Sequence, residues 1–98
     1  MNTVLITGAS RGIGLEFATQ YAEDGWQVVA CCRQPLQAEA LNKLADRYKN
    51  RFSIHPLDVC KLAEIDQLSH KLRDLPIDVL INNAGIYPSA QNGEFGHI

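Results

Sequence analysis

Four short apolar runs alternate with amphipathic segments along the chain, and this alternation constrains the fold more than any other feature. Thr3–Thr7, Gln27–Cys32 and Asp78–Asn82 are rich in β-branched or small apolar residues and show no polar alternation. Such runs are typical of strands that are buried on both faces, as in a parallel sheet. Strands separated by helices of about a dozen residues form βαβ units. The pattern therefore predicts an α/β fold with a doubly wound parallel sheet.

The three intervening segments each place apolar residues three or four positions apart, which is the spacing of an amphipathic helix. In the first segment these residues are Ile13, Phe17, Ala18, Tyr21 and Ala22. In the second they are Leu41, Leu44, Ala45 and Tyr48, with Pro35 expected in the first helical turn. In the third they are Leu62, Ile65, Leu68 and Leu72. We expect each set to face the sheet.

The remaining apolar run, Phe52–Leu57, alternates apolar and polar residues and contains Pro56, a pattern that favours an edge strand. Right-handed crossovers in a doubly wound sheet give four strands in the order 3-2-1-4, which places this run at an edge. The run at Asp78–Asn82 would form the opposite edge, although it is apolar on both faces. An apolar edge invites pairing with another chain, so we expect a homo-oligomer or a longer parent protein.

Composition excludes several classes of protein. The 98 residues fit one domain, predicted over residues 1–87, with residues 88–98 as a loop or tail. A net charge of −2 argues against nucleic-acid and membrane partners, and no apolar run could span a bilayer. Cys31, Cys32 and Cys60 lack the spacing of a disulfide framework or a metal site. We interpret them as small, buried, reduced thiols in a cytoplasmic protein that lacks a secretion signal.

The first strand ends in a glycine-rich turn, Gly8-Ala9-Ser10-Arg11-Gly12-Ile13-Gly14. In a doubly wound sheet, ligands bind at the carboxyl ends of the strands where the strand order reverses. Glycines allow a phosphate to approach the backbone, and the start of the following helix offers free N–H groups and a positive dipole. The alternative is a strand-to-helix turn that binds no ligand, in which the glycines only allow the backbone to turn tightly.

Three motifs in order carry a family resemblance. Thr7-Gly8-Ala9-Ser10-Arg11-Gly12-Ile13-Gly14 resembles the TGxxxGIG motif of the short-chain dehydrogenase/reductase family. Asp58-Val59 and Asn82-Asn83-Ala84-Gly85 resemble the family's DV and NNAG elements. Together they are spread, in the family's order, across essentially all of residues 3–86. CRQP and NNAGIYP are also similar to C-factor-like members of the family.

The resemblance implies roles for individual residues in binding a nicotinamide dinucleotide. Gly8, Gly12, Ile13 and Gly14 would line its pyrophosphate and adenosine side. Asp58 would accept a hydrogen bond from the adenine amino group, beside the Val59 backbone; alternatively, Asp58 caps the third helix. Asn83, Ala84 and Gly85 would border the adenosine ribose and the approach to the nicotinamide. Asn82 would instead hold its strand against a neighbouring strand.

The residues after the second strand favour NADP over NAD as the cofactor. NAD sites usually carry an acidic residue here that accepts from the ribose 2′-hydroxyl, whereas this chain has Arg33. In the family's geometry Arg11 faces the same ribose, and Ser10 could add a hydroxyl donor. Two guanidinium groups can clamp a 2′-phosphate through charge-assisted bonds. The alternative is that both arginines are solvated surface residues.

The resemblance also implies a catalytic Tyr-xxx-Lys pair, which this chain does not contain. Tyr21, Tyr48 and Tyr87 are each followed four residues later by a residue other than lysine. We therefore expect no catalytic residues here, and an inactive NADP-binding N-terminal portion of an oxidoreductase acting on a small carbonyl or alcohol. A non-catalytic dinucleotide-binding regulatory module is the main alternative. A nucleoside-binding methyltransferase sheet is a third, disfavoured by Arg33 where an acidic residue is usual.

Overall fold

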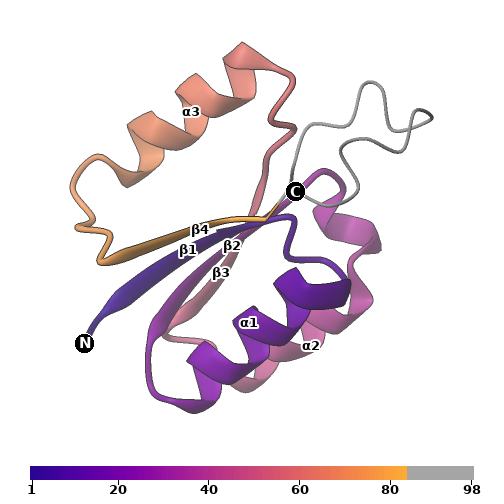
Figure 1. The fold of residues 1–98 in the computed structure, drawn as a ribbon, viewed down its shortest axis with the longest axis vertical. Helices are drawn as coiled ribbons and strands as arrows, with labels where there is room; N and C mark the ends of the chain where they lie inside the picture. Colours follow the sequence, from indigo (N-terminus) through magenta and orange to yellow (C-terminus); the bar gives the residue numbers. More distant parts are fainter. Residues whose placement is uncertain (84–98) are drawn as a thin grey trace.

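The computed structural model describes residues 1–83. Its elements follow in the order β1 (Thr3–Thr7), α1 (Gly12–Glu23), β2 (Gln27–Cys32), the 3₁₀ turn η1 (Pro35–Gln37), α2 (Glu39–Arg47), β3 (Phe52–Pro56), α3 (Leu62–Leu72) and β4 (Val79–Asn82). The four strands form one parallel sheet in the order β3-β2-β1-β4, which confirms the predicted topology. Helices α1 and α2 cover one face of this sheet and α3 lies on the other (Figure 1).

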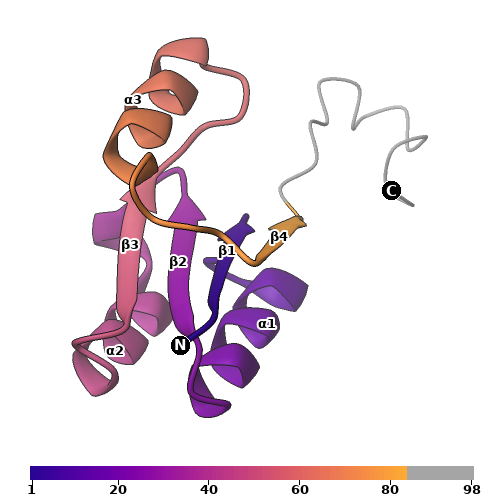
Figure 2. The same cartoon turned by 90° about the vertical axis from the view of Figure 1, so that its left-hand side faces the viewer.

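The strands are parallel and paired residue by residue, so their carboxyl ends lie together on one side of the molecule. Ile6 pairs with Ala30 of β2 on one side and with Ile81 of β4 on the other. Figure 2 shows β3, β2, β1 and β4 side by side in this order. The strand order reverses between β1 and β4, so the predicted switch point lies there.

Side chains on the α1–α2 face form the larger of two apolar clusters. Val4, Ile6, Val28 and Leu41 are fully buried in it. Tyr21 and Tyr48 are half-buried against the same cluster, as expected of core tyrosines.

The buried stripe of α1 differs from the predicted one. Gly14, Ala18 and Ala22 are its buried residues, four positions apart, and these small side chains let the helix lie close to the sheet. The prediction that Ile13 and Phe17 face the core is wrong, because their side chains are 67% and 37% exposed. Ile13 is thereby left accessible at the start of α1.

The end of α1 is closed by a Schellman motif. Gly25, at φ +87°, donates its N–H to the carbonyl of Ala22, and the N–H of Trp26 bonds the carbonyl of Tyr21. The Tyr21 and Trp26 rings meet edge to face at 4.8 Å between centroids. Arg51 donates to the carbonyls of Ala22 and Trp26 and lies over the Tyr48 ring. This guanidinium therefore ties the α2–β3 turn to the end of α1.

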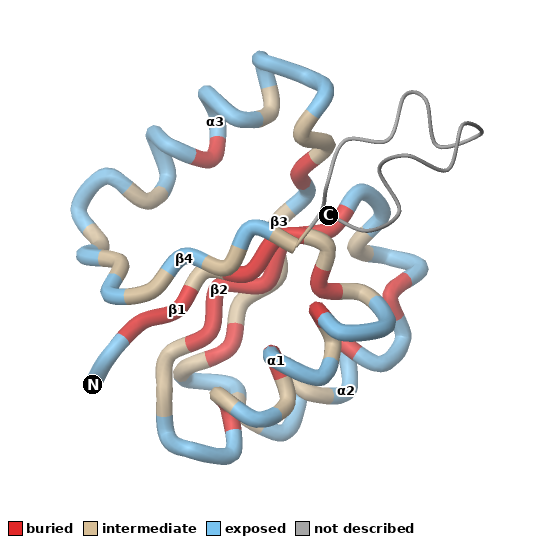
Figure 3. Tube along the Cα trace, viewed as in Figure 1, coloured by how far each residue is buried: buried red, intermediate tan, exposed pale blue. Residues whose placement is uncertain are grey.

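The second apolar cluster, on the α3 face, is smaller. Its buried members are Val29, Cys31, Leu57 and Leu68. Figure 3 shows that most of α3 is exposed, whereas the central strands are buried.

The predicted apolar face of α3 is only partly correct. Leu68 is buried and Leu72 is half-buried, but Leu62 and Ile65 are 83% and 40% exposed. The spacing of three and four residues identified the helix, yet within residues 1–83 little covers the side chain of Leu62 in its first turn. Leu80 of β4 is likewise 64% exposed on this face.

Several smaller expectations are also corrected. Pro35 lies in the separate turn η1 and not in α2. Strand β3 ends at Pro56, and Leu57 lies beyond it. Asp78 precedes β4, where its carboxylate accepts from the N–H of Thr3 at 2.7 Å and its own N–H bonds the Thr3 carbonyl.

The cysteines are free thiols, but they are not all buried. Cys31 and Cys32 are buried as predicted, and Cys60 is exposed, contrary to prediction. Burial, with a smaller contribution from Cys32, raises the pKa of Cys31 to about 12. Among residues 1–83 no group of acidic, histidine and cysteine side chains is arranged to hold a metal, and no helix is long and apolar enough to cross a membrane.

Candidate functional site

The glycine turn connects β1 to α1 at the switch point of the sheet. Gly8 and Gly12 adopt φ values of +61° and +59°, a left-handed conformation that glycine tolerates best. Between them, Ser10 is half-buried and Arg11 is exposed. The turn therefore reverses the chain direction immediately after the end of β1 and leads it into α1.

Gly14 is required by a close approach of backbones. A Cβ atom at this position would lie 2.1 Å from the carbonyl oxygen of Gly8 and 2.8 Å from Nδ2 of Asn83. No side chain other than hydrogen fits in this space. The third glycine of the motif therefore lets α1 start against the turn and against the end of β4.

Two hydrogen bonds hold the turn to the ends of the neighbouring strands, and a third joins β1 to β4 just before the turn. The N–H of Ala9 donates to the carbonyl of Cys31 at 3.0 Å, which joins the turn to the end of β2. Asn83 Nδ2 donates to the Gly8 carbonyl at 3.2 Å. The Thr7 hydroxyl bonds Oδ1 of Asn82 at 3.0 Å, as expected for a residue that holds β4 against β1.

The first turn of α1 has the features of an anion site. Arg11 occupies the N-cap position in an extended conformation and makes no side-chain capping bond. The first turn contains no acidic residue that would neutralise the positive end of the helix dipole. Within residues 1–83 no side chain of this turn caps its N–H groups, and the exposed Ile13 lies in the same turn.

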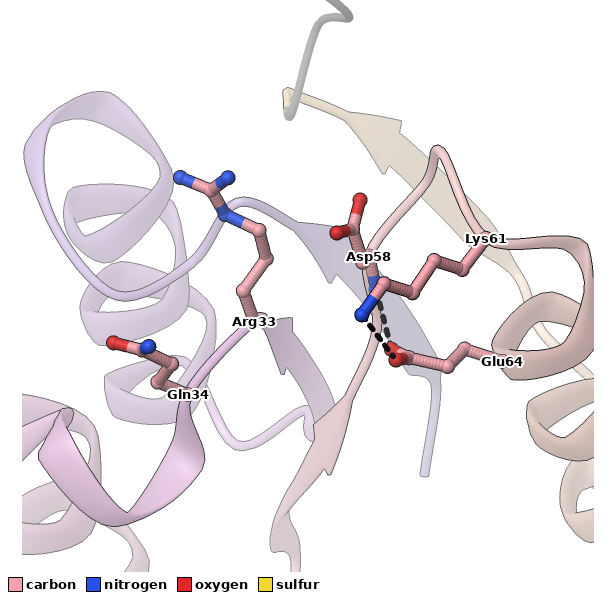
Figure 4. A pocket seen from close by; sticks show the side chains of 5 residues that line it. All are labelled: Arg33, Gln34, Asp58, Lys61 and Glu64. Atoms are coloured by element: carbon pink, nitrogen blue, oxygen red, sulfur yellow. Dashed lines mark hydrogen bonds and ion pairs between the residues drawn. The ribbon is translucent and has the colours of Figure 1, made fainter.

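A polar pocket of about 340 Å³ lies at the carboxyl ends of β2 and β3 (Figure 4). Its lining residues are Arg33, Gln34, Asp58, Lys61 and Glu64. Two cationic and two anionic side chains thus face one space. Arg33 and Asp58 were both predicted as binding residues, and the structure brings them together. Arg11 is not among the residues that line this pocket.

The loop after β3 presents Asp58 by a different means from helix capping. Helix α3 begins at Leu62 with Lys61 as its N-cap residue, so the alternative role of Asp58 as the N-cap is wrong. Asp58 Oδ1 instead accepts from the N–H of Cys60 at 3.0 Å, and the Asp58 carbonyl accepts from the N–H of Lys61 at 2.8 Å. Val59 packs against the α3-face cluster. The loop is therefore a tight turn anchored on the core.

Three residues that line this pocket were not predicted as site residues, namely Gln34, Lys61 and Glu64. Glu64 Oε1 accepts from the N–H of Asp58 at 2.7 Å, and Glu64 Oε2 lies 3.8 Å from Lys61 Nζ. A glutamate in the first turn of a helix was the available signal, since such residues commonly bond N–H groups that precede the helix. The remaining predicted site residues, Ala84 and Gly85, lie outside the described part of the chain.

Comparison with known proteins supports the resemblance on which these residues were selected. A family model described as short chain dehydrogenase matches residues 2–97. Protochlorophyllide reductase of Pisum sativum is 42% identical over 96 residues, which cover 94% of this chain and 24% of the pea protein. The chain thus spans about a quarter of the length of the curated relatives it matches.

Solved structures give the same result. A carbonyl reductase from Pseudomonas aeruginosa in complex with NADP superposes with a TM-score of 0.83 at 40% identity, covering 89% of this chain and 40% of that one. Menthone neomenthol reductase from Mentha piperita has a TM-score of 0.77 at 28% identity, over 87% of this chain and 32% of that one. Since the family model matches nearly every residue and the sheet order agrees, the protein belongs to the short-chain dehydrogenase family.

Proposed function

We propose that this chain binds NADP(H) as the cofactor-binding portion of a short-chain oxidoreductase that reduces carbonyls or oxidises alcohols. The observation that carries the proposal is the position of Arg33, which lines a pocket at the end of β2 where an NAD site would place a carboxylate. The NADP complex of the similar carbonyl reductase supports the same cofactor.

The residues present fit such a dinucleotide. The uncapped start of α1 and the turn at Gly8, Ser10, Gly12, Ile13 and Gly14 would hold the pyrophosphate and adenosine side. Asp58, with the Val59 backbone, would accept from the adenine amino group. Asn83, Ala84 and Gly85 would border the ribose and the nicotinamide. When bound, the cofactor supplies the hydride that a carbonyl carbon accepts.

Arg33 would bind the 2′-phosphate that distinguishes NADP from NAD. Arg33 is exposed, and in Figure 4 its guanidinium points away from the Glu64 carboxylate. A phosphate placed there would receive charge-assisted, potentially bidentate hydrogen bonds. Arg11, in the glycine turn and exposed, would reach the phosphate from the α1 side.

Substitution of Arg33 tests this assignment. Losing one charge-assisted contact of roughly 1.5–3 kcal/mol weakens affinity by about 10- to 150-fold. We expect Arg33→Ala to weaken NADPH binding by such a factor and to leave NADH nearly unchanged, whereas Arg33→Asp reverses the preference. The measurement is a calorimetric titration of both cofactors at fixed ionic strength, since salt screens exposed phosphate contacts.

Arg47→Ala is the matched control, because it removes one exposed arginine from the end of α2, which lies at the amino ends of the strands, opposite to the pocket. It should alter neither affinity. Equal loss of both cofactors in Arg33→Ala would mean that Arg33 acts on the fold or on the shared pyrophosphate, and the NADP assignment would then be wrong.

The hydride acceptor needs a proton donor near the nascent alkoxide. No tyrosine of this chain is followed four residues later by lysine, so we propose that this donor lies outside these 98 residues and that the chain alone is inactive. The relatives described above are reductases, which favours an oxidoreductase over a regulatory module.

We also propose that the chain self-associates through the open edge of β4. Within residues 1–83, β4 pairs only with β1, and Leu80 is 64% exposed beside that edge. Unpaired strand edges with apolar side chains are sites of chain pairing. We expect sedimentation at micromolar concentration to show a dimer or larger species, and Leu80→Lys to shift it to monomer. A monomer of the unmodified chain at all concentrations would contradict this.

The compartment we propose is the cytoplasm. The free thiols of Cys31, Cys32 and Cys60 support a reducing environment. The pea relative carries the word chloroplastic in its name, so a plastid is the competing location.

A further inference from the structure

We propose that Glu64 is a positioning residue for base recognition, which holds the loop of residues 57–61 so that Asp58 faces the adenine. The inference rests on the proposed function and assigns to Glu64 a role in selecting the base of the dinucleotide. Glu64 itself would not touch the ligand. It would act through the backbone N–H of Asp58.

The geometry around Glu64 carries the inference. Its side chain is only 29% exposed, and Oε1 accepts from the N–H of Asp58 at 2.7 Å. The second oxygen lies 3.8 Å from Lys61 Nζ, so the carboxylate is held from two sides. In Figure 4 both contacts converge on the Glu64 carboxylate at the floor of the pocket.

Helix α3 provides a fixed anchor for this carboxylate. The N–H groups of Glu64 and Ile65 bond the carbonyl of Lys61 at 3.1 and 3.3 Å, which closes the first helical turn. An acidic side chain in this turn is also stabilised by the positive end of the helix dipole. Glu64 therefore links a loop residue to the rigid start of a helix.

The remaining groups of Asp58 are arranged so that one oxygen is available to a ligand. The Asp58 carbonyl and Oδ1 accept from the N–H groups of Lys61 and Cys60. Within the described residues Oδ2 has no hydrogen-bond partner, and Figure 4 shows the carboxylate turned away from Glu64. The N–H of Leu57 also bonds the carbonyl of Cys32 at 2.8 Å and holds the loop to β2. The N–H of Asp58 itself, however, has Glu64 as its acceptor, so loss of Glu64 should loosen the turn at this residue.

A base-exchanged cofactor separates positioning from general stabilisation. A carboxylate accepts from the 6-amino group of adenine but repels the 6-oxo group of hypoxanthine. The ratio of affinities for NADPH and for nicotinamide hypoxanthine dinucleotide phosphate therefore reports whether Asp58 is in place. A variant that merely destabilises the fold weakens both ligands equally and leaves the ratio unchanged.

The experiment titrates both dinucleotides into the full chain and its variants. We expect the unmodified chain to prefer NADPH by about 10-fold or more, the effect of one hydrogen bond to a charged group. Asp58→Ala should abolish this preference. Glu64→Ala should lower it to about 3-fold or less, because the N–H of Asp58 loses its acceptor.

Two further substitutions keep the test decisive if Glu64→Ala does not fold. Glu64→Asp retains the charge but shortens the side chain by one methylene, and should also lower the ratio. Glu64→Gln retains an oxygen that can accept from Asp58, and should keep the ratio within about two-fold of the unmodified value. Asp66→Ala is the matched control, since it removes an exposed carboxylate of α3 that lies outside the pocket.

The outcomes distinguish the two proposals. If the unmodified chain binds neither dinucleotide, the proposed function fails and this inference fails with it. If it binds NADPH, but folded Glu64→Ala and Glu64→Asp keep the full base preference that Asp58→Ala loses, the proposed function stands and the positioning role of Glu64 is overturned. Binding of NADPH with no base preference in the unmodified chain overturns it equally.

Discussion

The two faces of the sheet differ in how completely they are packed. On the α1–α2 face, Val4, Ile6, Val28 and Leu41 are fully buried, and small residues of α1 bring the helix close to the strands. On the α3 face, the buried residues are fewer, and Leu62 and other apolar side chains remain exposed. One face is a close-packed core, whereas the other is a thin apolar layer.

The candidate site is built from both faces, and each contributes a different part. The glycine turn leads into α1 and depends on the close-packed face, where Gly14 leaves no room for a side chain. The pocket with Asp58 depends on a loop that leads into α3, where single polar contacts such as that of Glu64 hold the backbone. Substitutions near the turn should therefore cost stability, whereas those near the pocket should mainly alter affinity.

The largest expected effect tests the close packing at the start of α1. Gly14→Ala places a Cβ atom 2.1 Å from the Gly8 carbonyl oxygen, so backbone must move. We expect a loss of about 3 kcal/mol or more in the free energy of unfolding, measured by urea denaturation. Gly12→Ala is the control, because its Cβ meets nothing within 4 Å and only the φ of +59° is unfavourable. It should cost about 1–2 kcal/mol.

Equal losses in the free energy of unfolding for Gly14→Ala and Gly12→Ala would contradict the difference in packing between the two faces. They would mean that the turn and α1 can separate at little cost, and that the α1–α2 face is no tighter than the other.

Alanine substitution of three leucines should then show how much the packing of each face contributes to stability. Leu41 on the α1–α2 face is fully buried, Leu68 on the α3 face is 8% exposed and Leu62 is 83% exposed. We expect alanine substitution to cost about 3 kcal/mol at Leu41, about 2 kcal/mol at Leu68 and less than about 0.5 kcal/mol at Leu62. Thermal or urea unfolding measures all three. A cost at Leu62 similar to that at Leu68 would show that α3 is covered in solution.

The smallest expected effect is the pH dependence of folding stability that His55, on the α3 face, contributes. Burial, and then the charge of Lys71, lowers the pKa of His55 below its ordinary value of 6.5. The unfolded chain therefore binds a proton at higher pH than the folded chain does, so stability is lost as the pH falls below about 6.5. Urea denaturation at pH 7.5 and 5.5 should show this loss, and His55→Asn should reduce it.

His70→Asn serves as the reference for this last measurement, because His70 lies on the exposed surface of α3 beside Asp66. It should leave the loss of stability between the two pH values nearly unchanged. The interpretation of His55 fails if His55→Asn retains the whole pH dependence.

Local pattern was enough to predict the strands, their order and the place of the glycine turn. The apolar runs, the edge character of Phe52–Pro56 and the glycine spacing are all properties of near neighbours in the sequence. Chain handedness then dictates the sheet order and brings the ends of the strands together. The role of Asp58 came from the family resemblance and that of Arg33 from the missing carboxylate after the second strand, and the structure then places both residues in one pocket although they follow different strands.

Only the tertiary structure decided which faces of the helices are covered and how the pocket is held. Spacing of three and four residues identifies a helix but not what lies opposite it, so Ile13, Phe17, Leu62 and Ile65 were wrongly placed in the core. The bond between Glu64 and Asp58 depends on where α3 starts after a tight turn. Such contacts depend on the three-dimensional path of the backbone, which periodicity does not encode.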